Sequence, residues 1–214
     1  MLKSGMVHFL IIISIVFSIT AQTSKVIQNN PDKADYVIDS DITFEDAVSG
    51  KNIHKSILEN LRLVNVYYFG FDNKLHKGQL VVHKDVVLDI IEIFEFIRES
   101  HFPISKVIPI SKYDWSDEKS MQDNNTSAFN YRYISGTRVI SNHASGLAID
   151  INPLLNPYIK NEISIPSDCI YNTAKPGTIS SDSELVKEFK KWGWQLGGNW
   201  KSIKDYQHFE IKLK

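Results

Sequence analysis

One short segment of the 214-residue chain, SNHASGLAIDIN at residues 141–152, places an imidazole and a carboxylate close together in sequence. Apolar and other residues alternate from position 147 to 152, which is typical of a strand with one apolar face, and Asp150 lies on the other face. His143 precedes Asp150 by seven positions, an odd separation that places it on the opposite face of a continuous strand. Gly146 provides a break that can bring both side chains to one point. Convergence of these two groups on a pocket is the beginning of a metal site.

A second segment, DYQHFEIKL at residues 205–213, carries the same residue types. Its apolar residues at positions 209, 211 and 213 predict a strand with a core face, whose other face carries His208 and Glu210. Asp205 precedes His208 by three positions, a spacing that a turn converts into neighbouring side chains. The segment therefore adds one imidazole ligand and one further carboxylate.

Together the two segments contain the components of a hydrolytic zinc site carried on strands. Such a site needs three protein ligands, one open position and a nearby carboxylate that does not bind the metal. His143, Asp150 and His208 can provide the ligands, and Asp205 can provide the base. The helical zinc-protease motif, with two histidines four apart and an adjacent glutamate, is absent from the sequence. Taken alone, these residues also fit a simpler interpretation in which they only satisfy local hydrogen bonds.

The elements that must position these segments follow from the spacing of apolar residues. The pattern predicts a weak helix at 43–63, hairpin strands at 63–68 and 79–83 with a turn at Asp72–Asn73, an amphipathic helix at 84–100 that Pro103 closes, and a helix at 183–192 that Gly193 ends. This order of elements predicts an α+β domain with a small, mainly antiparallel sheet and flanking helices.

The N-terminus has the pattern of an export signal. Lys3 precedes an apolar run of 11 residues, Phe9–Ile19, and small and polar residues follow it. The run is shorter than the roughly 20 residues that span a bilayer as a helix; a buried strand or helix is the alternative. We therefore expect a signal peptide at 1–21, a polar arm at 22–42 and the functional domain at 43–214. The mature protein is then exported to the periplasm or the extracellular space, with no stable membrane span.

Composition excludes several classes of function. Lys plus Arg total 24 and Asp plus Glu total 25, so the formal net charge of −1 offers no broad field for nucleic acid. The one cysteine, Cys169, excludes an internal disulfide and a zinc site built mainly from thiolates. Cys169 has no histidine in a recognisable relation to it, so we do not expect it to act as a nucleophile. We expect a monomer.

The string SNHASGLAIDIN, with the distant DYQHF, resembles the D-alanyl-D-alanine carboxypeptidase (VanY-like) zinc peptidases. The wider group includes L-alanyl-D-glutamate endopeptidases, D-Ala-D-Ala dipeptidases and the hedgehog signalling domain. Its pattern, S-x-H-x(6)-D and later D-or-E-x-x-H, is met at every position. The stretches NNTSAFNYR at 124–132 and WGWQLGGNW at 192–200 are also similar to family segments, and the resemblance extends from about Leu63 to the C-terminus. It implies a fold like that of the hedgehog domain and the D-Ala-D-Ala peptidases.

The resemblance implies a function as well. It implies zinc-dependent hydrolysis of peptide bonds in the stem peptides of cell-wall peptidoglycan, by a D-Ala-D-Ala carboxypeptidase or an L-Ala-D-Glu endopeptidase. Zinc would be held by His143, Asp150 and His208, with Asp205 as the catalytic base. The alternative is a catalytically inactive zinc-binding module that binds cell-wall peptide, but such a module has no need of the carboxylate at Asp205.

Further residues receive roles from the same resemblance. Arg132 would bind a substrate carboxylate or the developing oxyanion, because guanidinium offers planar paired donors; a surface ion pair is its alternative. Ser141 would contact substrate. Trp192, Trp194 and Trp200 could line the cleft, although packing is the preferred interpretation. Four of the histidines outside both motifs are expected to be surface or structural residues: His54, His76, His83 and His101.

Overall fold

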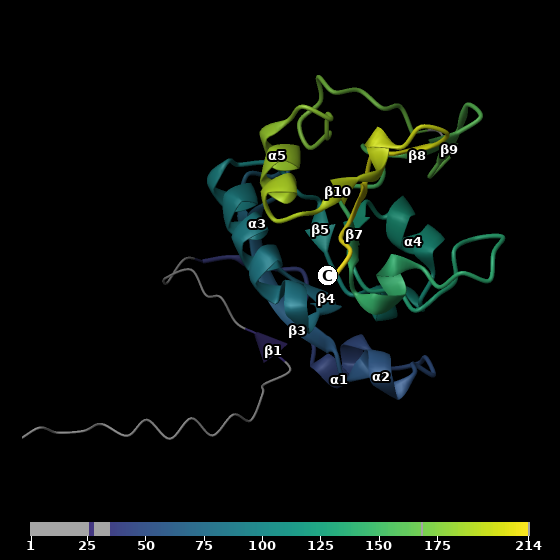
Figure 1. The fold of residues 1–214 in the computed structure, drawn as a ribbon. Helices are drawn as coiled ribbons and strands as arrows, with labels where there is room; N and C mark the ends of the chain where they lie inside the picture. The colour runs from purple at the N-terminus through teal and green to yellow at the C-terminus, as the bar shows by residue number, and fades with distance from the viewer. Residues whose placement is uncertain (1–25, 28–34, 168, 214) are drawn as a thin grey trace, which may run out of the picture.

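The computed structural model describes residues 26–27, 35–167 and 169–213 (Figure 1). The predicted signal peptide at 1–21 lies outside these described residues. Within the described part of the chain, no helix is long and apolar enough to cross a membrane.

The largest sheet is built on the predicted hairpin. Strands β3 (Leu61–Phe69) and β4 (Leu75–His83) pair antiparallel along their whole length, and Asn73 in the turn has a positive φ of 59°. An asparagine tolerates this left-handed conformation better than most residues, which explains the turn. The predicted hairpin is thereby confirmed, with longer strands than the sequence pattern indicated.

Two pieces of the predicted polar arm join the edges of this sheet. Strand β1 (Val26–Ile27) pairs parallel with β3, and β2 (Val37–Ile38) pairs parallel with β4. The order of strands in the sheet is therefore β1-β3-β4-β2. The sequence pattern of the arm showed no strand, because pieces of two residues are too short to display an alternation.

Helix α3 (Val87–Glu99) continues from the short 3-10 helix η1 (Lys84–Val86) and packs against β3. It buries Ile90, Ile93 and Ile97, which recur at helical spacing and have no measurable exposure. Helix α5 (Glu184–Lys191) lies beside α3 and begins at Ser183, whose hydroxyl accepts a hydrogen bond from the backbone N–H of Val186. Both predicted helices are confirmed.

The weak helix predicted at 43–63 is confirmed only in part. The structure has two single-turn helices there, α1 (Phe44–Ala47) and α2 (Lys55–Leu58), and the chain is already in β3 at Leu61. Phe44 and Ala47 enter a small second core with Phe129 and the sheet. The apolar residues near position 61 belong to the strand, which the helical interpretation missed.

The remaining elements surround the chemistry-bearing segments. One antiparallel sheet has the order β10-β12-β7, and another has the order β11-β8-β9. The elements are α4 (Asp117–Gln122), η3 (Asn142–Ser145), β7 (Ala148–Asp150), β8 (Tyr158–Lys160), β9 (Ile163–Ile165), β10 (Gln195–Leu196), η4 (Gly197–Asn199), β11 (Lys204–Asp205) and β12 (His208–Glu210). Residues far apart in sequence, around 117–150 and 195–210, thus meet at one place (Figure 1).

The fold is therefore mixed α/β, with small sheets and few helices, in agreement with the predicted α+β class. One detail of the predicted C-terminal strand was wrong. Phe209 is fully buried, but β12 ends at Glu210 and Leu213 is 43% exposed. The apolar alternation continues in the sequence beyond the point where the backbone leaves the sheet.

Candidate metal centre

His143 is positioned by a 3-10 turn that stands directly before β7. Ser141 begins η3, and its hydroxyl accepts a hydrogen bond from the backbone N–H of His143 at 3.3 Å. Gly146 ends the turn with a φ of 68°, a conformation that glycine adopts without strain. A Cβ at Gly146 would stand 2.5 Å from the backbone nitrogen of His83, so glycine is required for space as well. The predicted break at Gly146 therefore exists and returns His143 towards β7.

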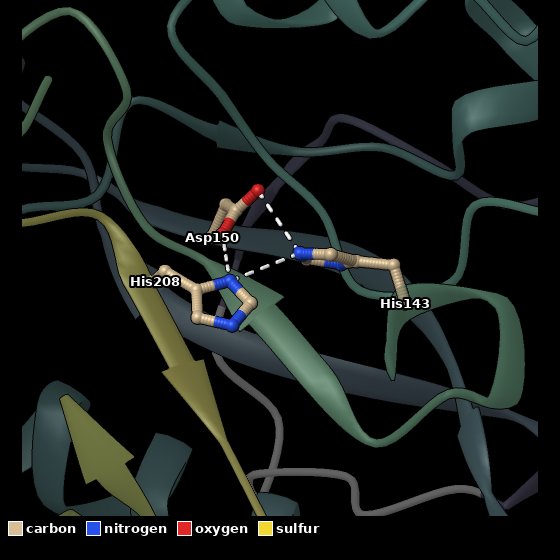
Figure 2. Close-up of side chains that lie close together, drawn as sticks. All are labelled: His143, Asp150 and His208. Carbon is tan, nitrogen blue, oxygen red and sulfur yellow. Dashed lines mark hydrogen bonds and ion pairs between the residues drawn. The ribbon is translucent and has the colours of Figure 1, made fainter. Parts of the chain in front are cut away.

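Asp150 and His208 are brought together by strand register. They are directly opposite partners on antiparallel β7 and β12, a position from which side chains on one face meet. His208 Nδ1 lies 3.0 Å from Asp150 Oδ1 and 3.1 Å from His143 Nε2, and His143 Nε2 lies 3.2 Å from Asp150 Oδ2 (Figure 2). All three residues are at least 90% buried. The three predicted ligands thus form one compact cluster.

The outer ring nitrogens of both histidines are held by acceptors. His143 Nδ1 lies 2.6 Å from the carbonyl oxygen of Ala128, and His208 Nε2 lies 3.3 Å from Glu210 Oε2. Because a carbonyl and a carboxylate only accept, these outer nitrogens carry the protons and donate. When both rings are neutral, the inner nitrogens, Nε2 of His143 and Nδ1 of His208, direct their lone pairs towards Asp150. This second layer of acceptors around imidazoles is typical of metal-binding histidines.

The arrangement fits zinc. Tetrahedral zinc with bonds of about 2.0–2.2 Å to nitrogen and oxygen holds its ligand atoms about 3.3 Å apart. The three separations in the cluster are 3.0, 3.1 and 3.2 Å, and each joins two groups that prefer to offer electron pairs. Two lone pairs and a carboxylate at this distance repel one another unless a cation or an added proton lies between them. The donor set and its spacing therefore fit a divalent metal ion.

Burial, hydrogen bonds and neighbouring charges shift the pKa values of the groups in this cluster. Although burial opposes the charged form, hydrogen bonds with Asp150 and Glu210 raise the pKa of His208 to about 10. Burial by itself would raise the pKa of Asp150, but the charge of His143 and hydrogen bonds from both histidines lower it below its ordinary value. The hydrogen bond with His208 also lowers the pKa of Glu210. The raised pKa of His208 thus favours the charged ring in the absence of a metal ion.

Asp205 lies in the same cleft but outside the cluster. Its Oδ1 is buried and has no hydrogen-bond partner among the described residues. Burial, followed by the nearby Asp150 carboxylate, raises the pKa of Asp205 to about 7, against the opposing effect of the two histidines and the Gln207 amide. A carboxyl group with a pKa near neutrality is suited to accept and return a proton.

A cavity of about 850 Å³ opens over the cluster. Asp205, Ser141 and Arg132 line it on the polar side. Its apolar lining includes Ile134, Val139, Ile163, Ile165, Ile203 and Trp200. A cavity of this size is sufficient for a short peptide segment. The structure therefore brings every predicted site residue to one cleft.

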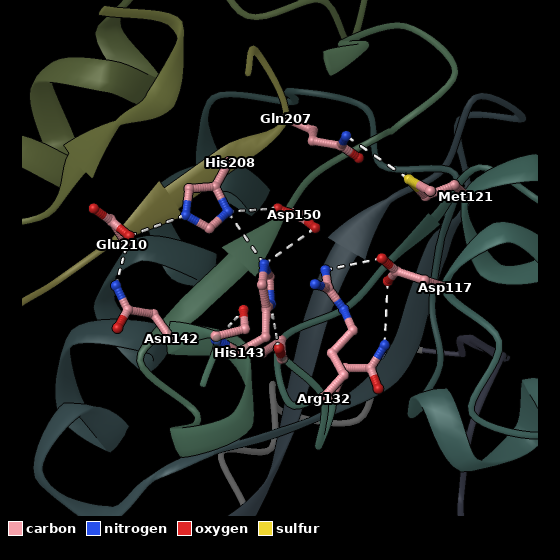
Figure 3. Close-up of polar contacts among 12 residues, drawn as sticks. Asp117, Met121, Arg132, Asn142, His143, Asp150, Gln207, His208 and Glu210 are labelled. Carbon is pink, nitrogen blue, oxygen red and sulfur yellow. Dashed lines mark hydrogen bonds and ion pairs between the residues drawn. The ribbon is translucent and has the colours of Figure 1, made fainter. Parts of the chain in front are cut away.

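Arg132 lies in the cleft and also forms an ion pair. Its Nη2 lies 2.8 Å from Asp117 Oδ2, and Asp117 Oδ1 also accepts a hydrogen bond from the Asn130 amide at 3.2 Å (Figure 3). The Arg132 and Asp117 side chains are each about one third exposed, at 31% and 33%. The structure thus contains the ion pair, which holds the guanidinium at the cavity wall.

Sequence reasoning missed some residues of the cleft and placed others differently. Trp194 is buried in the core as expected, whereas Trp200 lines the cavity with its ring centroid 5.4 Å from that of His208. Asp117 was not identified, because no motif connects it with Arg132. Gln207 was not identified either, although its place between the two motif residues of DYQHF was a usable signal.

The described histidines outside the motifs do not line the cleft. His54 and His83 accept hydrogen bonds at helix starts, as structural residues do. His76 is buried between the carboxylates of Asp39 and Asp72, and His101 stacks on a phenylalanine ring. The prediction of surface or structural roles is consistent with these contacts.

Comparison with known proteins adds one finding. Residues 135–211 match the sequence model of the family described as D-alanyl-D-alanine carboxypeptidase. No curated protein and no solved structure matched the chain. The matched segment includes His143, Asp150, Asp205 and His208, and it begins after Arg132. The family model that matches residues 135–211 is therefore the one that the motifs predicted, and this segment is similar to the D-alanyl-D-alanine carboxypeptidase family of peptidases.

Proposed function

We propose that this protein is a zinc-dependent peptidase that hydrolyses peptide bonds in the stem peptides of cell-wall peptidoglycan. Its action would be that of a D-Ala-D-Ala carboxypeptidase or an L-Ala-D-Glu endopeptidase. The observation that carries the proposal is the convergence of two imidazole nitrogens and the Asp150 carboxylate beside a further buried carboxylate, Asp205. The family match supports a peptidase.

His143, Asp150 and His208 would hold the zinc ion. When bound, zinc supplies Lewis-acid chemistry, which polarises a carbonyl group and allows water to attack near neutral pH. The Ala128 carbonyl and the Glu210 carboxylate fix both imidazole rings so that their lone pairs remain directed at the ion. The chain thus contributes a rigid ligand set with little reorganisation on binding.

Asp205 would carry the proton transfers. As the base, its carboxylate takes a proton from the attacking water and then returns it to the amine that leaves. In the metal-free protein burial is the largest cause that raises its pKa, and a buried carboxyl group of this kind is suited both to accept and to return a proton. Its Oδ1, which has no hydrogen-bond partner among the described residues, would be the atom that exchanges the proton.

Arg132 and Ser141 would contact the substrate. The Arg132 guanidinium can pair with a peptide carboxylate or with the oxygen that gains negative charge during attack. Asp117 holds Arg132 at the wall of the cavity but leaves its Nε without a partner among the described residues. Ser141 lines the same cavity. These groups would orient the peptide relative to Asp205.

The setting of this activity is also proposed. The apolar run at residues 9–19 supports export, which would bring the enzyme to the polymer that it cleaves. The arrangement of small sheets around a strand-borne site supports a fold like that of the hedgehog domain and the D-Ala-D-Ala peptidases. We propose that the mature protein acts as a monomer.

The experiment is a digestion of purified peptidoglycan by zinc-loaded protein, with mass analysis of the released fragments. Release of free D-alanine would identify a carboxypeptidase, and separation of L-Ala from D-Glu would identify an endopeptidase. Either kind of cleavage should be lost when a chelator is added and in the Asp205→Asn variant. The matched control, Asp182→Asn at an exposed position, should retain activity. Zinc-loaded protein that binds cell-wall peptide without cleaving it would contradict the proposal and favour the inactive module.

A further inference from the structure

Gln207 lines the cleft, and in the sequence it stands between the proposed base, Asp205, and a proposed ligand, His208. Its backbone carbonyl accepts a hydrogen bond from the N–H of Ile151 at 3.0 Å, which fixes it next to β7. Its side chain lines the cavity, and the residue is only 3% exposed. The amide nitrogen points at the Met121 sulfur at 3.9 Å, a weak contact (Figure 3).

The other half of this amide is unsatisfied. Gln207 Oε1 is buried and has no hydrogen-bond partner among the described residues. Buried carbonyl oxygens are nearly always paired, and leaving one unpaired is costly. An acceptor of this kind at the wall of a substrate cavity is suited to a donor that the substrate supplies.

Helix α4 places a matching donor on the same wall. Asp117 and Met121 are four residues apart on α4 and therefore lie on one face of the helix. Asp117 holds Arg132, and Met121 contacts Gln207. The Nε of Arg132 is buried and, within the described chain, has no acceptor. This side of the cavity thus contains one unpaired donor, Arg132 Nε, and one unpaired acceptor, Gln207 Oε1.

A peptide backbone carries the complementary pair, since each residue offers one N–H and one carbonyl. We propose that Gln207 is a substrate-binding residue whose Oε1 accepts a hydrogen bond from a backbone N–H of the stem peptide, outside the scissile bond. The open N–H of Arg132 donates to a carbonyl of the same peptide. This inference rests on the proposed function and adds to it a requirement for one particular substrate N–H.

The test measures binding, so it does not depend on turnover. Asp205→Asn protein loaded with zinc is titrated calorimetrically with a stem peptide and with analogues in which each non-scissile backbone N–H is replaced in turn by an ester oxygen. One replacement should weaken binding about tenfold, the effect of losing one hydrogen bond. The same replacement should have no effect when Gln207→Met is added, because the acceptor is already gone. Gln122→Met, an exposed residue on α4, is the matched control and should preserve the tenfold effect.

The outcomes separate this inference from the proposed function. An equal loss with and without Gln207→Met would overturn the inference and leave the proposed function standing. If no ester analogue binds more weakly than the parent peptide, the inference is overturned even where the Gln207→Met protein does not fold. Absence of any peptide binding by zinc-loaded protein would overturn both.

Discussion

The Asp205 side chain lies against Gly197, and the contact leaves no room for a larger residue at that position. A Cβ at Gly197 would stand 2.9 Å from Asp205 Cβ and 2.9 Å from its backbone oxygen. Gly197 begins η4, directly after β10, so the GGNW stretch brings the backbone within reach of the proposed base. The glycine is thus part of what determines the position of the carboxylate.

Replacing Gly197 by alanine should therefore displace Asp205. We expect Gly197→Ala to lower kcat about tenfold or more, because small displacements of a reacting group are costly, while bound zinc is retained. Steady-state kinetics and metal analysis of the same preparation check this. Unchanged kinetics in Gly197→Ala would show that the contact does not position the base.

Asp205→Asn tests the role of the carboxylate itself. The variant should keep its zinc, because the three ligands are untouched, and lose turnover by about 100-fold or more. Zinc content and kcat are the two measurements. Loss of zinc would mean that Asp205 is a ligand, and full activity would remove it from the mechanism.

Arg132→Ala should reduce kcat/KM about tenfold or more, with a small change in melting temperature, because its ion pair with Asp117 is partly exposed and contributes little stability. A role at the oxyanion would appear in kcat, and pairing with a substrate carboxylate would appear mainly in KM. Arg132→Lys should recover little, since lysine lacks the planar fork. Arg138→Ala, at an exposed position on the same loop, is the control. A destabilised variant with normal kinetics would instead establish a structural ion pair.

Zinc binding should release protons. Because the pKa of His208 is about 10 in the metal-free protein, the ring is charged at pH 8 and must become neutral to bind metal. Binding at pH 8 should therefore release about one proton or more, and the apparent zinc affinity should rise about tenfold per pH unit towards pH 10. Calorimetry in buffers of different ionisation enthalpy measures the number of protons released per zinc ion bound. Zinc binding without proton release would contradict the described state of His208.

Much of the fold was predictable because its signals are local. The hairpin of β3 and β4 follows from β-rich runs around Asn73, and α3 and α5 follow from apolar residues at helical spacing. The convergence on Asp150 was also predictable, because strand alternation and the break at Gly146 determine which side chains can meet.

The rest depended on contacts that no local pattern records. Asp117 reaches Arg132 only through the orientation of α4, so their pairing has no sequence signal. The edge strands β1 and β2 consist of two residues each, and tertiary pairing alone reveals them. Trp200 was expected to pack, but the turn after η4 places its ring beside His208 at the cavity.

The most direct test of the central claim is a zinc titration of metal-free protein, followed by stem-peptide hydrolysis and bound metal in the same samples. We predict that the activity of the wild-type protein rises with zinc and stops at one ion per chain. His208→Ala should hold far less zinc and show no hydrolysis, while His54→Ala, at an exposed position outside the cleft, should behave as wild type. Full hydrolysis by metal-free protein, or equal zinc content in the wild type and His208→Ala, would contradict the account.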